Sequence, residues 1–410
     1  MPAPLFLREA DALPRDEAPL PAQADVVIAG GGIAGISTAL ALARAGVSAV
    51  VLEAEVVAAR ASGRNDGQML LGLGEHYNRI VGQLGRERAR LLWDYILRNN
   101  QAMKDEIAAA GNACGLESRG GLRLSCSEHE QRELEEASAL MREDGIPHEL
   151  LPAEAIGRVL PAARGFHGVL RLPGEAIVQP AAMVRGFALR AREAGARIVE
   201  GARVVAIERD GDDASRVVLA DGRAIRCAMV VHCTSTLARE LDASGFLKAQ
   251  VFPFRGQIHA TAVLPDAIAA QFPPCAMSTH FCYEYFRVHE KRFVVGGMRW
   301  SVPGEQLGIL DDQNHDDRVS VNLRAFVDRH FPALAAIPFV EAWSGIMAGT
   351  HDALPLLGAL PGRPGVMALL GFNGYGLSFA FEAGRSLAQI VVDGKASHPA
   401  VALFAPRRFA

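Results

Sequence analysis

The chain has 410 residues, of which 50% are apolar and 21% are charged. At roughly 100–200 residues per domain, this length predicts two or three units with a large core. The formal net charge is -4, and charges of both signs are mixed along the sequence. Because a nucleic-acid binder needs a basic surface, we expect no nucleic-acid partner.

The six cysteines are too few for a disulfide scaffold and include no C-x-x-C pair, so they are expected to be reduced and packed. The segment from Val26 to Ala43 carries no charge for 18 residues, which is the lower limit for crossing a bilayer. Glycines interrupt it, and no signal-peptide pattern precedes it. We therefore expect a cytoplasmic protein without a transmembrane segment.

The first structural signals follow a proline-rich start. Residues 1–23 hold five prolines and no apolar period, which predicts an extended arm. Asp25–Ala29 is typical of a buried parallel strand, Ile33–Ala45 has the period of a helix, and Ala49–Leu52 is a second short strand. This order predicts one βαβ unit.

The rest of the chain alternates between helical and strand patterns. Helices are predicted over Tyr77–Ala110, Glu128–Glu143 and Pro180–Glu193, and from the glycines near Gly371 to about Val392. Alternation over Val251–Trp300 predicts a second, mostly antiparallel sheet. Short strands are predicted at Gly121–Ser125, Gly168–Leu172, Ile198–Glu200, Val204–Glu208, Val217–Ala220, Ala224–Arg226 and Met229–His232.

The loop after the first strand reads Gly30-Gly31-Gly32-Ile33-Ala34-Gly35, a G-x-G-x-x-G pattern. Gly30 would make the tight turn, Gly32 would let backbone approach a pyrophosphate, and Gly35 would allow close packing of helix and strand. Glu53 follows Gly35 by 18 residues, where an acid can accept hydrogen bonds from a ribose. The pattern predicts a dinucleotide site but does not distinguish NAD from FAD, because both cofactors bind to it.

Seven further segments point to one superfamily. The sequence resembles the FAD-dependent D-amino-acid oxidase/glycine oxidase superfamily, and within it the γ-glutamylputrescine oxidase-like amine oxidases. The resemblance runs from about residue 20 to Phe409. It is carried by Ala61–Gln68, Tyr285-Phe-Arg287, Gly296-Gly297, Trp343–Met347, Thr350–Asp352, Leu354–Gly358 and Gly371–Gly376.

The resemblance implies an α/β fold in which a glutathione-reductase-type, Rossmann-like FAD-binding domain is interleaved with a substrate domain on a mostly antiparallel sheet. Residues 20–75, 165–237 and 340–395 are expected to form the FAD-binding domain. Residues 76–164 and 238–339 are expected to form the substrate domain, with terminal arms at 1–19 and 396–410.

The resemblance also implies where FAD is held. The helix start after Gly371 would direct its N–H groups at the flavin edge that becomes anionic on reduction, and Arg64 could neutralise phosphate. The strand from Val204 would pass near the adenine. With Gly30, Gly32, Gly35 and Glu53, the expected FAD-binding residues are Ser62, Arg64, Asn65, Gly67, Gln68, Val204, Thr234, Gly345, Gly371, Phe372, Asn373, Gly374, Tyr375, Gly376 and Leu377.

Alternation over residues 283–289 places Tyr283, Tyr285 and Arg287 on one face. That face either covers the flavin and orients the substrate, with Arg287 available to bind an anionic group, or is the solvent-exposed side of a sheet. Candidate catalytic residues are Tyr285, Arg287, Asp66 and His351. Tyr283, Gln257 and His259 are expected to line the substrate site.

Two of those candidates have an equally simple interpretation. Asp66 either faces a substrate ammonium or is a solvated loop acid, and His351 is more often a packed or exposed residue than a base. No acid–base pair is required, because a neutral amine can transfer hydride from its α-carbon to flavin N5 once it is correctly held.

The function implied by the resemblance is oxidation of a C–N bond in a small amine or amino acid. The imine would hydrolyse to an aldehyde or keto product, and O2 would be reduced to H2O2. A dehydrogenase that passes electrons to a quinone or a protein is the alternative, and a non-catalytic nucleotide-binding protein is a lesser one. No cysteine stands in Gly345–Thr350 and no histidine stands near Ser62, so FAD is expected to be noncovalent; no metal site is expected.

Overall fold

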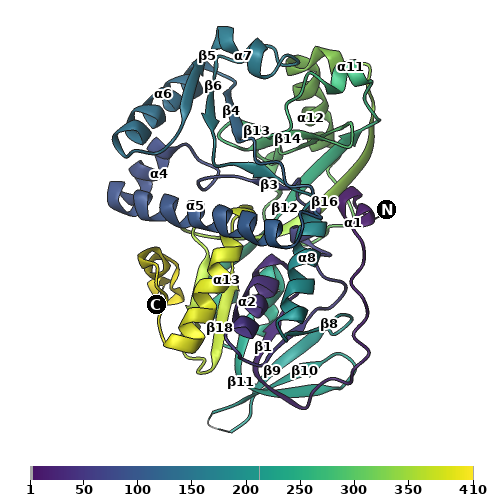
Figure 1. Cartoon of the computed structure of the whole chain (residues 1–410), viewed down its shortest axis with the longest axis vertical. Coiled ribbons are helices and arrows are strands. Elements are labelled where there is room, and N and C mark those ends of the chain that lie inside the picture. Colours follow the sequence, from purple (N-terminus) through teal and green to yellow (C-terminus); the bar gives the residue numbers. More distant parts are fainter. Residues whose placement is uncertain (1–2, 212, 410) are drawn as a thin grey trace.

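The computed structural model describes residues 3–211 and 213–409, and Met1, Pro2, Asp212 and Ala410 lie outside them. These four fall in the expected terminal arms and in one turn. The described residues form two eight-stranded sheets and a two-stranded one. In Figure 1 the two large sheets lie one above the other along the vertical axis, and α5 crosses between them.

The first sheet carries the predicted βαβ unit. Its strand order is β17-β18-β11-β1-β2-β8, in which β11, β1, β2 and β8 are parallel neighbours. Strand β18 runs parallel to β11, and β17 is antiparallel to β18. Strands β9 and β10 form an antiparallel hairpin, and β10 also pairs with β11 in the antiparallel direction. The strands are β1 (Gln23–Ala29), β2 (Ala49–Leu52), β8 (Arg197–Val199), β9 (Val204–Arg209), β10 (Ser215–Leu219), β11 (Ala224–His232), β17 (Leu356–Ala359) and β18 (Val366–Leu370).

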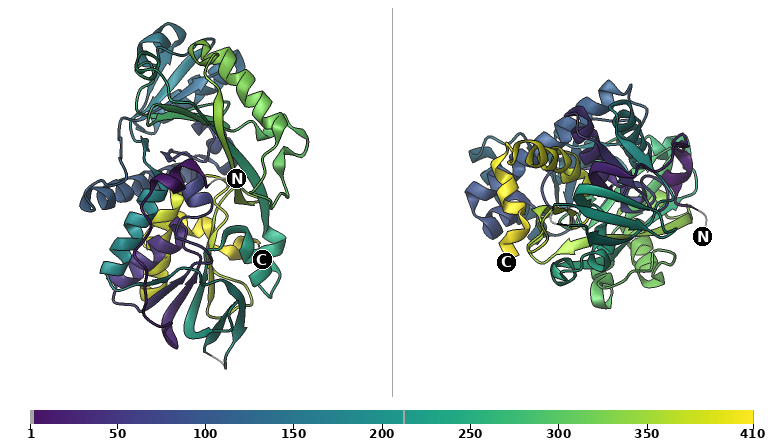
Figure 2. Two further views of the ribbon diagram at one scale, coloured as in Figure 1. Left: turned by 90° about the vertical axis from the view of Figure 1, so that its right-hand side faces the viewer. Right: turned by 90° about the horizontal axis from the view of Figure 1, so that it is seen from below.

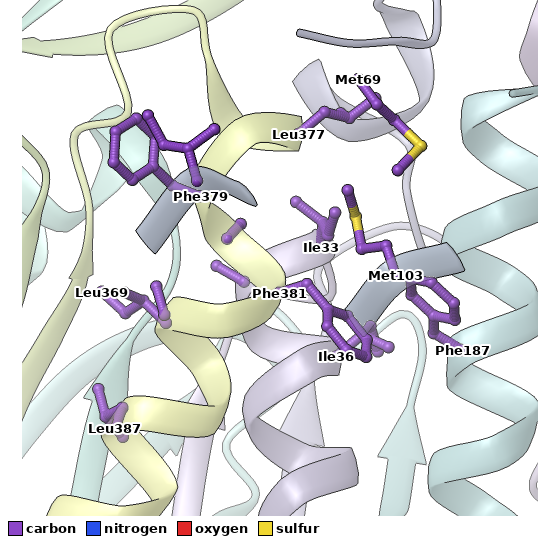
Figure 3. Close-up of a cluster of buried hydrophobic side chains, with 14 of the residues drawn as sticks. Ile33, Ile36, Met69, Met103, Phe187, Leu369, Leu377, Phe379, Phe381 and Leu387 are labelled. Carbon is purple, nitrogen blue, oxygen red and sulfur yellow. The ribbon is translucent and has the colours of Figure 1, made fainter. Parts of the chain in front are cut away.

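Helices pack together beside this sheet because each buries an apolar face. They are α2 (Ile33–Arg44), α5 (Arg86–Ala109), α8 (Pro180–Glu193) and α13 (Gly376–Asp393). Helices α2 and α13 touch closely at Gly384, where a Cβ would lie 2.7 Å from the Ser37 Cβ. Figure 3 shows Ile33 and Ile36 of α2 beside Phe381 of α13, whose ring centroid is 4.8 Å from that of Phe187 of α8.

The second sheet has the order β16-β12-β15-β14-β13-β4-β6-β5, and β13 with β4 is its parallel pair. Its other neighbours are antiparallel. One face packs on α12 (Asp317–His330), which Figure 2 shows along the outer side of the sheet. The strands are β4 (Gly121–Ser125), β5 (Glu149–Pro152), β6 (Gly168–Leu172), β12 (Val251–Thr261), β13 (Ala276–Thr279), β14 (Glu284–His289), β15 (Arg292–Gly296) and β16 (Phe339–Thr350).

Shorter elements connect these layers. Strands β3 (Gln68–Met69) and β7 (Ala176–Ile177) form the two-stranded sheet. The remaining α-helices are α1 (Leu5–Glu9), α3 (Ala61–Arg64), α4 (Tyr77–Leu84), α6 (Glu128–Glu143), α7 (Ala153–Val159), α9 (Ala238–Leu241), α10 (Phe246–Gln250) and α11 (Asp266–Ala269).

The fold class predicted from the sequence is confirmed, and three local predictions need correction. The helix expected over Tyr77–Ala110 is broken at Gly85, which has φ +78°. The two strands expected within 224–232 are one strand, β11. The arm at residues 1–23 contains helix α1, because Leu5 and Phe6 find apolar partners in the core.

The sheet pairing also changes the expected domain boundaries. Strand β6 lies in the segment 165–237 but pairs with β4 and β5 of the second sheet. Strand β16 lies in the segment 340–395 but pairs with β12 along its whole length. We therefore propose that the substrate domain includes β6 and β16 and otherwise keeps the predicted division.

The uncharged stretch from Val26 to Ala43 forms most of β1, the glycine loop and most of α2. Among the described residues, no helix combines the length and apolar character needed to cross a bilayer. All six cysteines are free thiols, five of them buried, as expected from the sequence.

Candidate active site

A cavity of about 550 Å³ joins elements of the two large sheets. Its wall begins at the glycine loop and α2, continues along residues 61–75, and reaches the loop before α13. Strands β12, β14 and β16 supply the opposite side. Residues from distant parts of the sequence therefore meet at one site.

The glycines of the loop after β1 are required by close contacts. Gly30 has φ +108°, and a Cβ there would lie 2.5 Å from the carbonyl oxygen of Cys233. A Cβ on Gly35 would lie 2.0 Å from the carbonyl oxygen of Gly30, so only glycine lets α2 approach its own loop. Gly32 lines the cavity, where a Cβ would meet the Ser62 hydroxyl at 2.9 Å.

Glu53 holds the glycine loop in place. Its carboxylate accepts hydrogen bonds from the backbone N–H of Gly31 at 2.7 Å and of Glu55 at 2.8 Å. Burial raises the pKa of Glu53. The carboxylate thus lies at the end of β2 beside the loop, where the sequence predicts it, although it does not line the cavity itself.

Residues 62–68 form a tightly bonded wall. Ser62 Oγ accepts from the N–H of Ile33 at the start of α2, and Asn65 closes a turn by accepting from the N–H of Gly67. Arg64 donates to the carbonyls of Ala59 and Ser344 and pairs with Asp312 at 3.0 Å. Arg64 lines the cavity but shares Asp312 with Arg60, and the prediction that it neutralises a phosphate stays a prediction.

Asp66 and Gln68 line the cavity beside this turn. Gln68 Nε2 donates to an Asp66 carboxylate oxygen at 2.5 Å. The Asp66 side chain is buried, and this burial raises its pKa against the opposing charge of Arg287. The alternative of a solvated loop acid is therefore wrong.

The loop before α13 closes one end of the cavity, and every residue from Gly371 to Leu377 lines it. Asn373, at φ +54°, accepts from the N–H of Thr350 and donates to the carbonyl of Gly371, which ties the loop to β16. The first turn of α13 opens into the cavity, so the positive end of its helix dipole faces the space there.

Strand β14 and the turn before it place two aromatic rings on the cavity wall, those of Tyr283 and Tyr285. Burial raises the pKa of both hydroxyls, so both are protonated near neutral pH. On the opposite face Glu284 and Phe286 are fully buried, so neither face of β14 is a solvent face.

Three other candidates point away from the cavity. Arg287 is buried behind its wall, where it donates to the carbonyls of Asp66 and Val178, and it does not line the cavity. Gln257 contacts His259 and Ser320 on the α12 side of β12. Burial lowers the pKa of His259 to about 4, which makes it a packed neutral histidine.

The remaining predicted residues lie at the edges. His351 lines the cavity, but its ring packs on Phe252 with centroids 5.5 Å apart and bonds a backbone carbonyl. Gly345 lines the wall, whereas Val204 and Thr234 do not. Val204 packs in the core beneath the first sheet, and the Thr234 hydroxyl is buried without a hydrogen-bond partner.

Several wall residues carried no sequence signal. Phe254 and Arg299 line the cavity. Gly74 lines it too, and a Cβ there would overlap the Tyr375 hydroxyl at 1.6 Å. These contacts join positions far apart in the sequence, so no local spacing could reveal them.

The comparisons with known proteins agree with this geometry. The sequence pattern of the DAO family, described as FAD dependent oxidoreductase, matches residues 25–390. The chain belongs to this family. It is 26% identical over 372 residues to gamma-glutamylputrescine oxidoreductase of Escherichia coli (strain K12), covering 90% of this chain and 83% of that protein.

Two further proteins are similar to this chain, one in sequence and one in fold. Glycine oxidase of Bacillus licheniformis is 25% identical over 377 residues, covering 90% of this chain and 93% of that protein. The crystal structure of L-proline dehydrogenase from P. horikoshii superposes with a TM-score of 0.80 at 20% identity, covering 95% of this chain and 98% of that chain. The last likeness shows that the DAO-family fold is shared.

The residues on the wall fit the FAD on which the DAO family depends. The glycine loop leaves no space for side chains at Gly30 and Gly35, and α2 starts at the cavity, which suits a pyrophosphate. The Gln68 Oε1 atom on this wall is buried without a hydrogen-bond partner, as a group that binds a polar ligand would be.

Proposed function

We propose that this chain is an FAD-dependent oxidase of a C–N bond in a small amine or amino acid. The observation that carries the proposal is the continuous cavity from the glycine loop to the first turn of α13, with two tyrosine rings on its wall. The glycine loop suits a dinucleotide, and the free N–H groups at the start of α13 suit a group that gains negative charge.

The protein's own part in this reaction is positioning. When bound, FAD supplies the acceptor for the hydride, which carries both electrons away from the carbon next to nitrogen. Tyr283 and Tyr285 hold the substrate between apolar surfaces and exclude water, which favours a reactive orientation. Loss of hydride from carbon and of a proton from nitrogen forms a C=N bond.

Water then hydrolyses this imine to an aldehyde or keto product and releases ammonia or an amine. The two electrons, with two protons, reduce O2 to H2O2. Steady-state peroxide formation in a peroxidase-coupled assay with amines and amino acids tests the proposal. One peroxide per carbonyl product is expected, and a carbonyl product without peroxide would overturn the oxidase assignment.

We propose that FAD is bound noncovalently. Cys233 and Cys282 line the cavity, but burial raises the pKa of both thiols, so they stay protonated and are poor nucleophiles. Acid precipitation of the yellow protein is expected to leave the flavin in the supernatant. Flavin that stays in the pellet would contradict this.

The six unpaired cysteines also support a cytoplasmic location.

A dehydrogenase of the same fold is the second candidate. It is favoured by the composition of the wall: the described residues that line the cavity include Arg64 and Arg299 but no lysine ammonium that could assist O2. Substrate-dependent bleaching of the flavin that persists in air, with reoxidation by a quinone, would identify this activity.

A further inference from the structure

The strongest unexplained feature of the cavity is a buried acid without a cation. Asp66 is 7% exposed and lines the cavity, and its side chain is held by the Gln68 amide and by the backbone N–H groups of Asp66 and Gln68. No ion pair joins Asp66 to a lysine, arginine or histidine in the described residues. Taking a carboxylate out of water costs several kcal/mol unless a partner compensates the charge.

Arg287 lies close by but is already used. Its guanidinium donates to the carbonyl oxygens of Asp66 and Val178 at 3.0 and 2.7 Å and contacts His289. It lowers the cost of the negative charge on Asp66 without binding the carboxylate. The carboxylate therefore keeps room for a cation that arrives from the cavity.

Both arginines that line the cavity already have partners in the protein. Arg64 is held by Asp312 and by backbone carbonyls. Arg299 lies over the rings of Phe254 and Tyr283, with its side chain 24% exposed and bonded to Glu305. A buried carboxylate needs a charged donor of its own, and an arginine fork is the usual one.

A large part of the cavity wall is apolar or aromatic, although Arg299, Glu75 and Glu305 also line it. Phe252, Phe254, Ile258, Met347 and Tyr285 contribute this surface. Such a surface accepts an alkyl or aryl chain and excludes water, which strengthens an ion pair at Asp66. One end of the ligand is thus required to be cationic, and its body is required to be apolar.

Building on the function proposed above, we propose that the cavity selects amines without a carboxylate on the reacting carbon, and that the Asp66 carboxylate binds the substrate ammonium. The bound ammonium loses one proton to water, and the neutral amine that results loses the hydride. An α-amino acid would bring a second charge that finds no free cation in the buried part of the wall. The substrate class is therefore primary or secondary alkyl and aralkyl amines.

Pairs of compounds that differ only in that carboxylate test the selection on the wild-type holoenzyme. Butylamine against norvaline and phenethylamine against phenylalanine are suitable probes. The amine of each pair is expected to have a kcat/KM at least about 30-fold higher, since an unpaired buried charge is penalised by that factor or more. Oxidation of the amino acids with equal or higher kcat/KM would overturn the inference and leave the proposed function standing. Oxidation of neither class would overturn the proposed function itself.

The variant Asp66→Asn removes the charge while keeping the shape. It is expected to raise KM for amines about 30-fold or more, with kcat at saturation nearly unchanged and flavin content equal to that of wild type. Asp105→Asn, which removes an exposed charge on α5 from a residue bonded to Gln101, is the control and should match wild type. An unchanged KM in Asp66→Asn would refute the role of Asp66.

A third measurement needs no variant and holds even if Asp66→Asn fails to fold. tert-Butylamine has no hydrogen on the carbon that bears nitrogen, so it can bind but cannot be oxidised, and pivalate is its carboxylate counterpart. We expect tert-butylamine to perturb the flavin spectrum and to inhibit competitively, at least about tenfold more tightly than pivalate. Tighter binding of pivalate would contradict the proposal.

Discussion

Gly35 decides how closely α2 approaches the loop that precedes it. A Cβ at this position would lie 2.0 Å from the carbonyl oxygen of Gly30 and 3.2 Å from a methyl carbon of Ile28. We expect Gly35→Ala to destabilise the protein by about 1–3 kcal/mol and to lower its flavin content, because overpacking shifts the loop. Thermal unfolding and the ratio of flavin to protein absorbance measure both effects.

Gly82→Ala is the matched control, because Gly82 lies in α4 and a Cβ there would meet nothing within 4 Å. This variant should be stabilised by up to about 1 kcal/mol, since alanine favours the helix. Equal thermal stability of Gly35→Ala and wild type would show that the close approach is not required.

His232 couples stability to pH. It is fully buried at the end of β11, neither ring nitrogen has a hydrogen-bond partner, and burial lowers its pKa to about 4. The unfolded chain, with a histidine pKa near 6.5, binds the proton first, so stability is complete above about pH 6.5 and is lost as pH falls toward 4. The expected loss is about 2 kcal/mol at about pH 5.

Urea unfolding of wild type and of His232→Gln at about pH 7.5 and about pH 5 measures this loss. The variant lacks the titrating group, so its unfolding free energy should fall by about 2 kcal/mol less than that of wild type between the two pH values. The same pH dependence in both proteins would assign acid sensitivity to other groups.

At the scale of elements, the short helix α1 is part of the second sheet's core. Phe6 is fully buried and packs on His289 and Trp343, with ring centroids 4.9 and 6.1 Å away. Glu9 at the end of α1 bonds His289 at 2.7 Å, which in turn contacts Arg287 behind the cavity wall. The N-terminal segment therefore supports the strand that carries Tyr285.

We expect Phe6→Ala to cost about 3–5 kcal/mol, as for other buried aromatic side chains, and to lower the midpoint of thermal unfolding. Val321→Ala on α12 removes a side chain that is 66% exposed and should change stability by less than about 0.5 kcal/mol. If Phe6→Ala were as harmless as Val321→Ala, α1 would be a loosely attached arm.

The sequence predicts long, periodic elements well and their surroundings less well. The bounds of α6 and α8 agree with prediction, because amphipathic periods, an N-terminal proline and terminal glycines are local signals. One turn of helix at Leu5–Glu9 has too few residues to show a period. Alternation in β14 identifies its two faces but says nothing of what covers each, since burial depends on segments distant in sequence.

The same limit applies to the site. The glycine loop and the turn before α13 were predictable because backbone geometry there requires glycine. The contacts of Arg64 could not be predicted, because the Asp312 carbonyl that it contacts is 248 residues away in the sequence. Arg287 shares a face with Tyr285 in the sequence pattern, yet only the fold shows that it lies behind the wall.

At the scale of the whole molecule, the chain passes several times between the two large sheets, and the cavity lies where their elements meet. The dinucleotide loop belongs to one sheet, and the tyrosine wall belongs to the other. The site can therefore form only when both sheets are folded and docked. Membership of the FAD-dependent oxidoreductase family agrees with this arrangement.

The most direct test of the account is anaerobic mixing of the purified protein with one equivalent per flavin of an amine such as phenethylamine. The account predicts a yellow protein whose flavin absorbance disappears on mixing, then returns in air with one peroxide formed per flavin. A colourless protein without bound nucleotide, or a flavin band that no amine or amino acid bleaches, would contradict it.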